Sequence, residues 1–193
     1  MAKAPEIRVA ASELDRAVAT ITLAFAADPF TRWVWPGAAD FLEHFPSVLR
    51  EFALPAAASQ SGYVSEDFGG AALWIAPRVQ PNEAALVAII ERSVRGKRKD
   101  DFLEVFGQMG SYHPEEPHWY LPMIGVDPSR QNAGHGSALL RHALARCDRE
   151  GLPAYLESSN PVNIPLYQRH GFEIMGEIRV ADSPVMTPML RAG

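Results

Sequence analysis

The stretch from Tyr120 to Leu140 restricts the possible folds of this chain more than any other segment. It starts with apolar residues typical of a β-strand, which Asp127-Pro128 ends, and it continues into a turn that contains Gly134 and Gly136. Apolar residues then recur at helical spacing, at Leu139, Leu140, Ala143, Leu144 and Cys147. A strand, a glycine turn and a helix in this order favour an anion site, because the first N–H groups of a helix lack partners and the helix dipole is positive there. The two glycines also leave out side chains that would hold a phosphate group away from the backbone.

The residues around this turn narrow the choice of phosphate ligand. The chain has no G-x-x-x-x-G-K-[ST] motif, which disfavours a nucleoside triphosphate site. A dinucleotide fingerprint needs a third small residue three places after Gly136, and Leu139 stands there. Glu157 follows the glycine turn at close to the sequence spacing expected for the acid that binds the ribose in a dinucleotide site. A Rossmann fold therefore stays open as an alternative. That fold would need several more strand and helix units than the chain provides before Gly193.

Two linked motifs resemble those of the GNAT acetyltransferases. Gln131, Gly134 and Gly136 satisfy the Q-x-x-G-x-G pattern after an apolar strand, and the segment from Asn163 to Phe172 ends a helix in Tyr-x-x-x-Gly-Phe. In that family the first motif is the acetyl-CoA loop. Residues 113–121 and 153–160 resemble segments of the puromycin N-acetyltransferase-type bacterial enzymes. The resemblance covers the C-terminal half well and the N-terminal half poorly.

The resemblance implies a set of site residues. The backbone near Ile124 to Val126 would supply unpaired N–H groups beside the thioester, where donors about 3 Å from the developing charge stabilise it. Tyr167 matches the family's tyrosine and would protonate the leaving thiolate, since a phenol of pKa about 10 stays protonated at neutral pH. Asn163 would contact the CoA arm, and Asn132 stands where the family commonly has glycine. The full set expected to bind acetyl-CoA is Ile124, Gly125, Val126, Gln131, Asn132, Ala133, Gly134, His135, Gly136, Ser137, Asn163 and Tyr167.

Three residues are candidates for the base that accepts the amine proton. Glu157 ends a strand beside the central one, and His118 and Tyr120 lie on the approach of the central strand to the site. The sequence leaves the choice among them open.

Two tryptophans are candidates for the acceptor site. Trp33 and Trp35 follow the helix stop at Asp28-Pro29 and precede Pro36-Gly37, which predicts a loop, where binding residues concentrate. The alternative is that both simply belong to the core. Large aromatic rings stack on flat, apolar groups, and the negative net charge of the chain favours a cationic acceptor. We therefore expect a small, cationic, partly apolar amine there.

Composition excludes several classes of protein. The chain has 193 residues, 47% of them hydrophobic, and a formal net charge of −5, which fits one globular domain over residues 1–193 and argues against a nucleic-acid partner. Cys147 is the single cysteine and is expected in the core. No stretch has the character of a signal peptide or a membrane span, so we expect a soluble cytoplasmic protein, monomeric or homodimeric, without a membrane partner.

Histidines and acids near residues 113–118 could suggest a metal site. The two prolines in this connector deny His113 and His118 the shared helix face that such sites use, so we expect no metal. His135 and His142 are expected to be exposed.

Turn signals and periodicity predict the remaining elements. Strands are expected at 7–9, 61–64, 70–76, 154–157, 174–180 and 185–190, and helices at 14–25, 40–54, 83–94 and 101–109, the first of them capped by Ser12. Ala72 and Trp74 should face one side of their strand, and Leu73 and Ile75 the other. The order predicts a mixed α/β (α+β) fold, a sheet covered by helices. The GNAT resemblance implies that this sheet is central, mostly antiparallel and splayed.

The expected function is acetyl-CoA-dependent N-acetylation of the primary amine of a small molecule, by direct attack in a ternary complex. The alternative is a non-catalytic acyl-CoA-binding sensor or partner module on the same fold, because a fold and a ligand site do not imply turnover.

Overall fold

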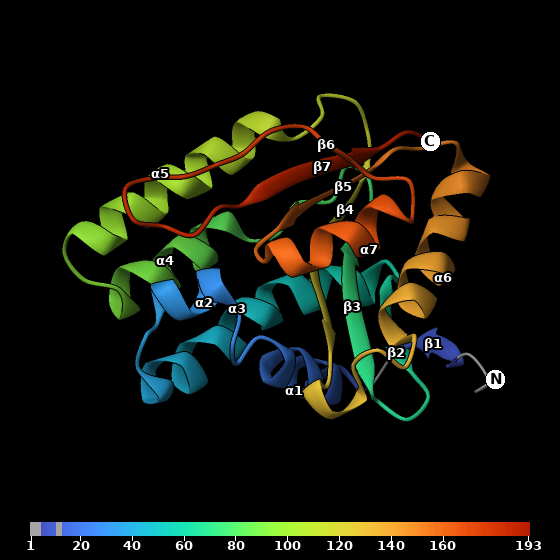
Figure 1. Cartoon of the computed structure of the whole chain (residues 1–193), viewed down its shortest axis with the longest axis horizontal. Helices are drawn as coiled ribbons and strands as arrows, with labels where there is room; N and C mark the ends of the chain where they lie inside the picture. Colours follow the sequence, from blue (N-terminus) through green and yellow to red (C-terminus); the bar gives the residue numbers. More distant parts are fainter. Residues whose placement is uncertain (1–4, 11–12) are drawn as a thin grey trace.

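The computed structural model describes residues 5–10 and 13–193, which form a seven-stranded mixed sheet flanked by helices (Figure 1). The strand order is β1-β2-β3-β4-β5-β7-β6, and only β4 and β5 run parallel. The strands are β1 (Ile7–Val9), β2 (Gly62–Ser65), β3 (Gly70–Ile75), β4 (Trp119–Val126), β5 (Ala154–Ser158), β6 (Glu173–Ile174) and β7 (Thr187–Arg191). The predicted mixed, mostly antiparallel sheet is confirmed.

The helices lie on both faces of this sheet. They are α1 (Leu14–Ala24), α2 (Pro29–Val34), α3 (Ala38–Ala58), α4 (Glu83–Ser93), α5 (Lys97–Tyr112), α6 (His135–Glu150) and α7 (Ile164–Gln168), with short 3-10 turns η1 (Pro128–Arg130) and η2 (Pro161–Asn163). Successive side chains of β3 point to opposite faces of the sheet, as predicted. Leu73 and Ile75 pack with residues of α1, α3 and α4, whereas Ala72 and Trp74 pack with residues of α6. Cys147 is buried in the second cluster, as expected.

The predicted loop after Asp28-Pro29 is wrong, because these residues start the helix α2. The Asp28 side chain accepts a hydrogen bond from the Thr31 N–H at 2.9 Å, and Pro29 occupies the first helical position. Asp-Pro therefore caps a new helix here as well as separating it from α1. The cap assigned to Ser12 lies outside the described residues.

Other predicted boundaries also differ from the structure. The helix predicted at 101–109 is α5, which runs from Lys97 to Tyr112. α3 continues to Ala58 although it contains Pro46 and Pro55, so the predicted end at Leu54 is four residues early. The predicted strand 174–180 is only partly extended: β6 ends at Ile174, and a single bridge joins Ile178 to Met186.

The two parallel strands at the centre of the sheet separate after two residue pairs. β4 pairs with β5 only at Trp119 with Ala154 and at Tyr120 with Tyr155. Beyond this point β4 stays paired with β3 as far as Val126. Because the pairing with β5 stops there, an open wedge lies between the C-terminal part of β4 and β5.

A bulge in β4 sets the direction of its free backbone groups. Leu73 pairs with Met123 but Ile75 pairs with Tyr120, so β4 has one residue more than β3 in this interval. Pro122, which has no N–H to donate, lies inside the bulge. Past it, the Asp127 N–H donates to the Gly69 carbonyl at 3.0 Å. Because N–H groups point alternately to the two sides of a strand, those of Ile124 and Val126 point toward β5 and the wedge.

Candidate active site

The glycine turn places the N-terminus of α6 beside the wedge. Gly134 caps the helix with φ of 88°, a left-handed conformation that favours glycine, and the Ala138 N–H makes the first helical hydrogen bond to the Gly134 carbonyl. The N–H groups of His135, Gly136 and Ser137 therefore have no acceptor within the helix. Asn132 has φ of 61°, which asparagine tolerates better than most residues, so its replacement of the family's glycine preserves the turn.

The prediction that His135 is exposed is wrong. Its side chain is buried under the turn between β2 and β3, where a Cβ on Gly69 would lie 2.6 Å from the His135 Cε1 atom. The first helical residue points toward this turn and away from solvent, a direction that depends on how α6 docks on the sheet. His142, seven residues later, is exposed as predicted.

One cavity of about 790 Å³ joins the glycine turn to the wedge and to an apolar chamber. All of the residues expected to bind acetyl-CoA except Ala133 line its first end, together with Arg169. The chamber at the other end has an aromatic and aliphatic wall, made by Phe30, Phe45, Phe52, Leu86, Ile90, Phe102, Phe106, Met109 and Met186. The Phe30 and Phe102 rings are 6.1 Å apart in this wall.

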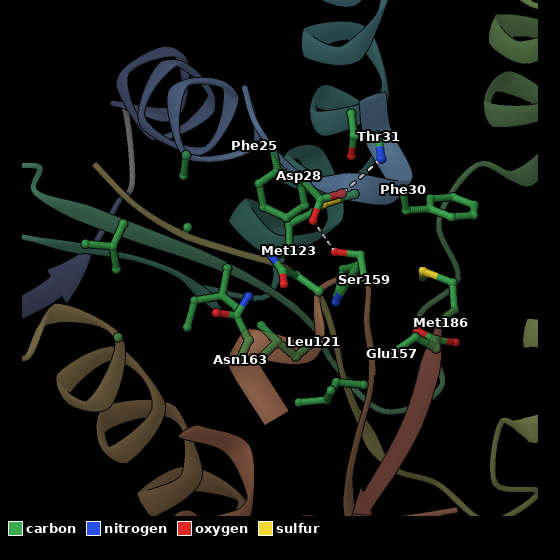
Figure 2. A pocket seen from close by; sticks show the side chains of 18 of the residues that line it. Phe25, Asp28, Phe30, Thr31, Leu121, Met123, Glu157, Ser159, Asn163 and Met186 are labelled. Atoms are coloured by element: carbon green, nitrogen blue, oxygen red, sulfur yellow. Dashed lines mark hydrogen bonds between the residues drawn. The ribbon is translucent and has the colours of Figure 1, made fainter. Parts of the chain in front are cut away.

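Two carboxylates, Asp28 and Glu157, face the cavity from its otherwise apolar end (Figure 2). Asp28 is 7% exposed and accepts hydrogen bonds from Thr31 N–H at 2.9 Å and from the Ser159 hydroxyl at 2.6 Å. Burial raises the pKa of the Asp28 carboxyl, and these hydrogen bonds lower it in part. The Glu157 side chain is 2% exposed, and its Oε1 atom is buried without a hydrogen-bond partner. A buried, unsatisfied carboxylate oxygen is rare and marks Glu157 as a functional candidate.

The predicted acid Tyr167 lies on the same cavity. Its side chain is 6% exposed and packs edge-on against Phe172, with the ring centroids 6.1 Å apart. Burial, together with the nearby charge of Asp28, raises the pKa of the Tyr167 phenol, which therefore stays protonated at neutral pH. Asn163, at the end of η2, lines the cavity on the side opposite Glu157 (Figure 2).

The sequence of residues 63–172 matches the acetyltransferase (GNAT) family, over more than half of the chain. The chain belongs to the GNAT acetyltransferase family. An uncharacterized N-acetyltransferase of Schizosaccharomyces pombe is 28% identical over 181 residues, which cover 86% of this chain and 72% of that protein. This GNAT chain is therefore an enzyme, an N-acetyltransferase.

Solved structures agree with the fold. A structure described as histone acetyltransferase HPA2 and related acetyltransferase, from Corynebacterium glutamicum, has a TM-score of 0.69 and 27% identity and covers 98% of this chain and 97% of its own. A polyamine N-acetyltransferase of Drosophila melanogaster has a TM-score of 0.67 at 14% identity, covering 97% and 99%. Arylalkylamine N-acetyltransferase 2 of Aedes aegypti has a TM-score of 0.70 at 12% identity, covering 97% and 98%. The last two likenesses concern the fold alone.

The three candidate bases of this GNAT enzyme lie in one cluster. Glu157 and Tyr120 line the main cavity, whereas His118 lines a neighbouring cavity of about 620 Å³. Burial, followed by the charge of Glu157, raises the pKa of Tyr120 well above its ordinary value. Burial lowers the pKa of His118, an effect that the neighbouring His113 reinforces.

The two predicted acceptor residues lie in different surroundings. Trp35 lines the cavity, is 4% exposed, and donates its indole N–H to the Ser93 hydroxyl at 3.1 Å. Trp33 is not among the residues that line the cavity, and its indole N–H donates to Asp182 at 3.2 Å.

Sequence reasoning missed Asp28 and Ser159 as site residues. Asp28 appeared only as a helix stop, and Ser159 belongs to a segment used only for the family resemblance. The Asp28-Pro29 pair could have indicated a helix cap. Its neighbours in the sequence do not indicate that Asp28 lines a cavity, because its partner there, Ser159, lies 131 positions further along the chain.

Within residues 5–10 and 13–193, no three His, Cys, Asp or Glu side chains are placed to hold a metal ion. In the same described part of the chain, no helix has both the length and the apolar character that crossing a bilayer requires.

Proposed function

We propose that this enzyme transfers an acetyl group from acetyl-CoA to the primary amine of a small molecule by direct attack in a ternary complex. The observation that carries the proposal is the single cavity that joins the free N–H groups of α6, the wedge between β4 and β5, and two buried carboxylates. Donor and acceptor can meet in such a cavity with water largely excluded.

The α6 end of the cavity suits the phosphates of CoA. The N–H groups of His135, Gly136 and Ser137 and the positive end of the helix dipole attract the pyrophosphate. In the wedge, the N–H groups of Ile124 and Val126 stabilise the negative charge that develops on the thioester oxygen.

The proton transfers are assigned to Glu157 and Tyr167. Glu157 takes a proton from the bound ammonium group, which frees the nitrogen lone pair to attack the thioester carbon. As the C–S bond breaks, Tyr167 gives its proton to the leaving thiolate, and the second proton lost by the nitrogen restores the Tyr167 phenol. Tyr120 is the weaker candidate for the base because its raised pKa keeps the phenol protonated, with no site to accept a proton. His118 does not line the main cavity and so has no direct access to the amine.

The chamber favours a cationic amine with an apolar body. Asp28 and Glu157 attract an ammonium group, and the aromatic wall with Phe30 and Phe102 buries hydrocarbon or an aromatic ring. Trp35 lines the same cavity beside this wall, with its ring centroid 6.3 Å from that of Phe45. We keep Trp33 as a candidate that acts through Phe30, because the centroids of these two rings lie 5.5 Å apart. The expectation from the sequence that residues 113–121 and 153–160 resemble puromycin N-acetyltransferase-type enzymes agrees with a small-molecule amine.

A screen of amines with thiol detection tests the proposal. Purified protein is mixed with acetyl-CoA and arylalkylamines, polyamines, aminonucleosides or peptide N-termini, and free CoA is followed over time. We expect the highest kcat/KM for amines that combine one ammonium group with an apolar body. Binding of acetyl-CoA without thiol release for any amine in the panel would contradict the proposal.

Replacement of Gly136 by valine tests the CoA end. A Cβ at this position would lie 3.2 Å from the Leu166 Cδ2 atom and 3.8 Å from the Val126 Cγ2 atom, and both of these residues line the cavity beside the glycine turn. We expect Gly136→Val to raise the Kd of acetyl-CoA by about tenfold or more, the equivalent of one charge-assisted hydrogen bond. Ala145→Val, at an exposed position of the same helix, is the matched control, and equal acetyl-CoA affinity in the two variants would argue against phosphate binding at α6.

Replacement of Asp28 by asparagine tests the acceptor end. Asparagine caps helices as well as aspartate, so α2 should persist while the negative charge is lost. We expect the KM of the amine to rise about tenfold, because the amine loses its charge-assisted hydrogen bond to the Asp28 carboxylate. The KM of acetyl-CoA should change little, because acetyl-CoA makes no such bond to Asp28. Asp100→Asn removes the same charge from an exposed position on α5, outside the cavity, and serves as the control. A parallel rise of both constants would exclude a specific role in amine binding.

A further inference from the structure

A chain of three side chains leads from the proposed base to a second cavity. The Glu157 Oε1 atom lies 3.4 Å from the His113 Nε2 atom, and the His113 Nδ1 atom lies 3.2 Å from the His118 Nε2 atom. The His118 Nδ1 atom lies 2.9 Å from the carbonyl oxygen of Glu116. The chain thus starts at the main cavity, which Glu157 lines, and ends at the second, which His113 and His118 line.

The backbone carbonyl of Glu116 fixes the proton positions along this chain. A carbonyl oxygen only accepts, so the His118 Nδ1 atom carries the hydrogen and donates it. In neutral His118 the Nε2 atom is then an acceptor, which requires the His113 Nδ1 atom to be a donor. The Nε2 atom of neutral His113 consequently presents a lone pair to Glu157.

Two acceptors therefore face each other when Glu157 is ionised and His113 is neutral. The Glu157 Oε1 atom has no hydrogen-bond donor in the structure, and the facing His113 Nε2 atom carries no hydrogen in this tautomer. A single proton placed between these two atoms converts a repulsive contact into a charge-assisted hydrogen bond. The pair is arranged to take up one proton.

The other groups around the pair leave this arrangement intact. Tyr120 on β4 and Tyr155 on β5 face Glu157, and burial, followed by the charge of Glu157 and by hydrogen bonding to it, raises the pKa of both phenols, so both stay protonated. The Oε1 atom of Glu157, which faces His113, still lacks a partner. The lowered pKa of His118 keeps its ring neutral at neutral pH. Tyr112 at the end of α5 is the remaining titratable neighbour of Tyr155, and Glu115 and Glu116 line the second cavity.

We propose that Glu157 and His113 together take up the proton released by the amine, and that His113 and His118 pass it to water in the second cavity. The amine proton moves to Glu157, Glu157 gives one to the His113 Nε2 atom, His113 releases its Nδ1 proton to the His118 Nε2 atom, and His118 releases its own Nδ1 proton to water. Each ring gains one proton and loses one, so charge and atoms balance. Both rings then carry their hydrogen on Nε2, and exchange with water in the second cavity, which both rings line, restores the Nδ1–H tautomers before the next turnover. This relay rests on the proposed function, because it needs an amine that gives up a proton at Glu157.

Two substitutions of His118 separate its two proposed roles, which are to fix the tautomer of His113 and to pass on the proton. Glutamine can accept from the His113 Nδ1–H group through its amide oxygen but cannot pass a proton on. Phenylalanine offers no acceptor, which frees His113 to carry its hydrogen on Nε2 and donate to Glu157. His142→Phe, at an exposed position on α6, is the control.

The pH dependence of kcat/KM for the amine gives the expected signatures. For His118→Phe, the acid limb should move down by about one pH unit, because one hydrogen bond to the Glu157 carboxylate is gained. For His118→Gln, the acid limb should stay in place while kcat falls about tenfold or more, and added imidazole should restore part of the rate. The KM of acetyl-CoA should not change in either variant.

An independent measurement does not need the variants to fold. Nitrogen-15 NMR of the histidine rings in the wild-type protein reports which ring nitrogen carries the hydrogen. We expect the Nδ1–H tautomer for both His113 and His118 at pH above the acid limb. The Nε2–H tautomer at His113, or superimposable pH profiles for wild type and both variants, would overturn the relay. A wild-type protein that releases no thiol with any amine would instead overturn the proposed function, whatever the tautomers.

Discussion

Glu157→Gln is expected to lower kcat by about 10²- to 10⁴-fold, the usual contribution of a general base. Glutamine keeps the shape of the side chain but cannot accept the amine proton, so the loss should fall on the chemical step. Because Glu157 lies at the chamber end of the cavity, the KM of acetyl-CoA should stay close to that of the wild type. The measurement is steady-state thiol release with the best amine of the screen, at several pH values.

A matched control separates this effect from a general loss of charge. Glu104→Gln changes an exposed glutamate on α5 and should leave kcat unchanged. If Glu157→Gln retained kcat within about threefold of the wild type, Glu157 would not be the base.

Tyr167→Phe is expected to lower kcat by about 10²-fold or more, with little change in CoA affinity. Phenylalanine keeps the ring that packs against Phe172 and removes only the hydroxyl that would protonate the thiolate. The raised pKa of this phenol keeps it protonated over the working pH range, so its titration should not limit activity near neutral pH. Single-turnover measurements with preloaded acetyl-CoA would isolate the chemical step from product release.

The alternative is that Tyr167 only packs. In that case Tyr167→Phe would be as active as the wild type, and Tyr167→Ala would lower the melting temperature without a specific loss of rate. Tyr63→Phe removes a hydroxyl from another buried tyrosine, on β2, and controls for the loss of a buried polar group. Equal rates for the two Phe variants would remove Tyr167 from the mechanism.

The sequence by itself determined the features that depend on neighbours along the chain. The strand, glycine turn and helix from Tyr120 to Leu140 form where they were expected, because their geometry follows from alternation, helical spacing and the left-handed conformation of Gly134. The alternation of β3 likewise assigned Trp74 and Leu73 to opposite cores. The family of the chain was also readable there, since both linked motifs lie within this local segment and the next.

Only the tertiary structure decided the acceptor side. Asp28 and Ser159 are hydrogen-bonded across 131 positions of the chain, and His113 reaches Glu157 from the connector before β4. Trp33 and Trp35 looked equivalent in sequence, yet only Trp35 lines the cavity, because α2 turns successive side chains to different sides. His135 looked like a surface residue until α6 was docked against the turn before β3. Contacts between distant segments depend on how whole helices and strands pack, and no local pattern of residues records that packing.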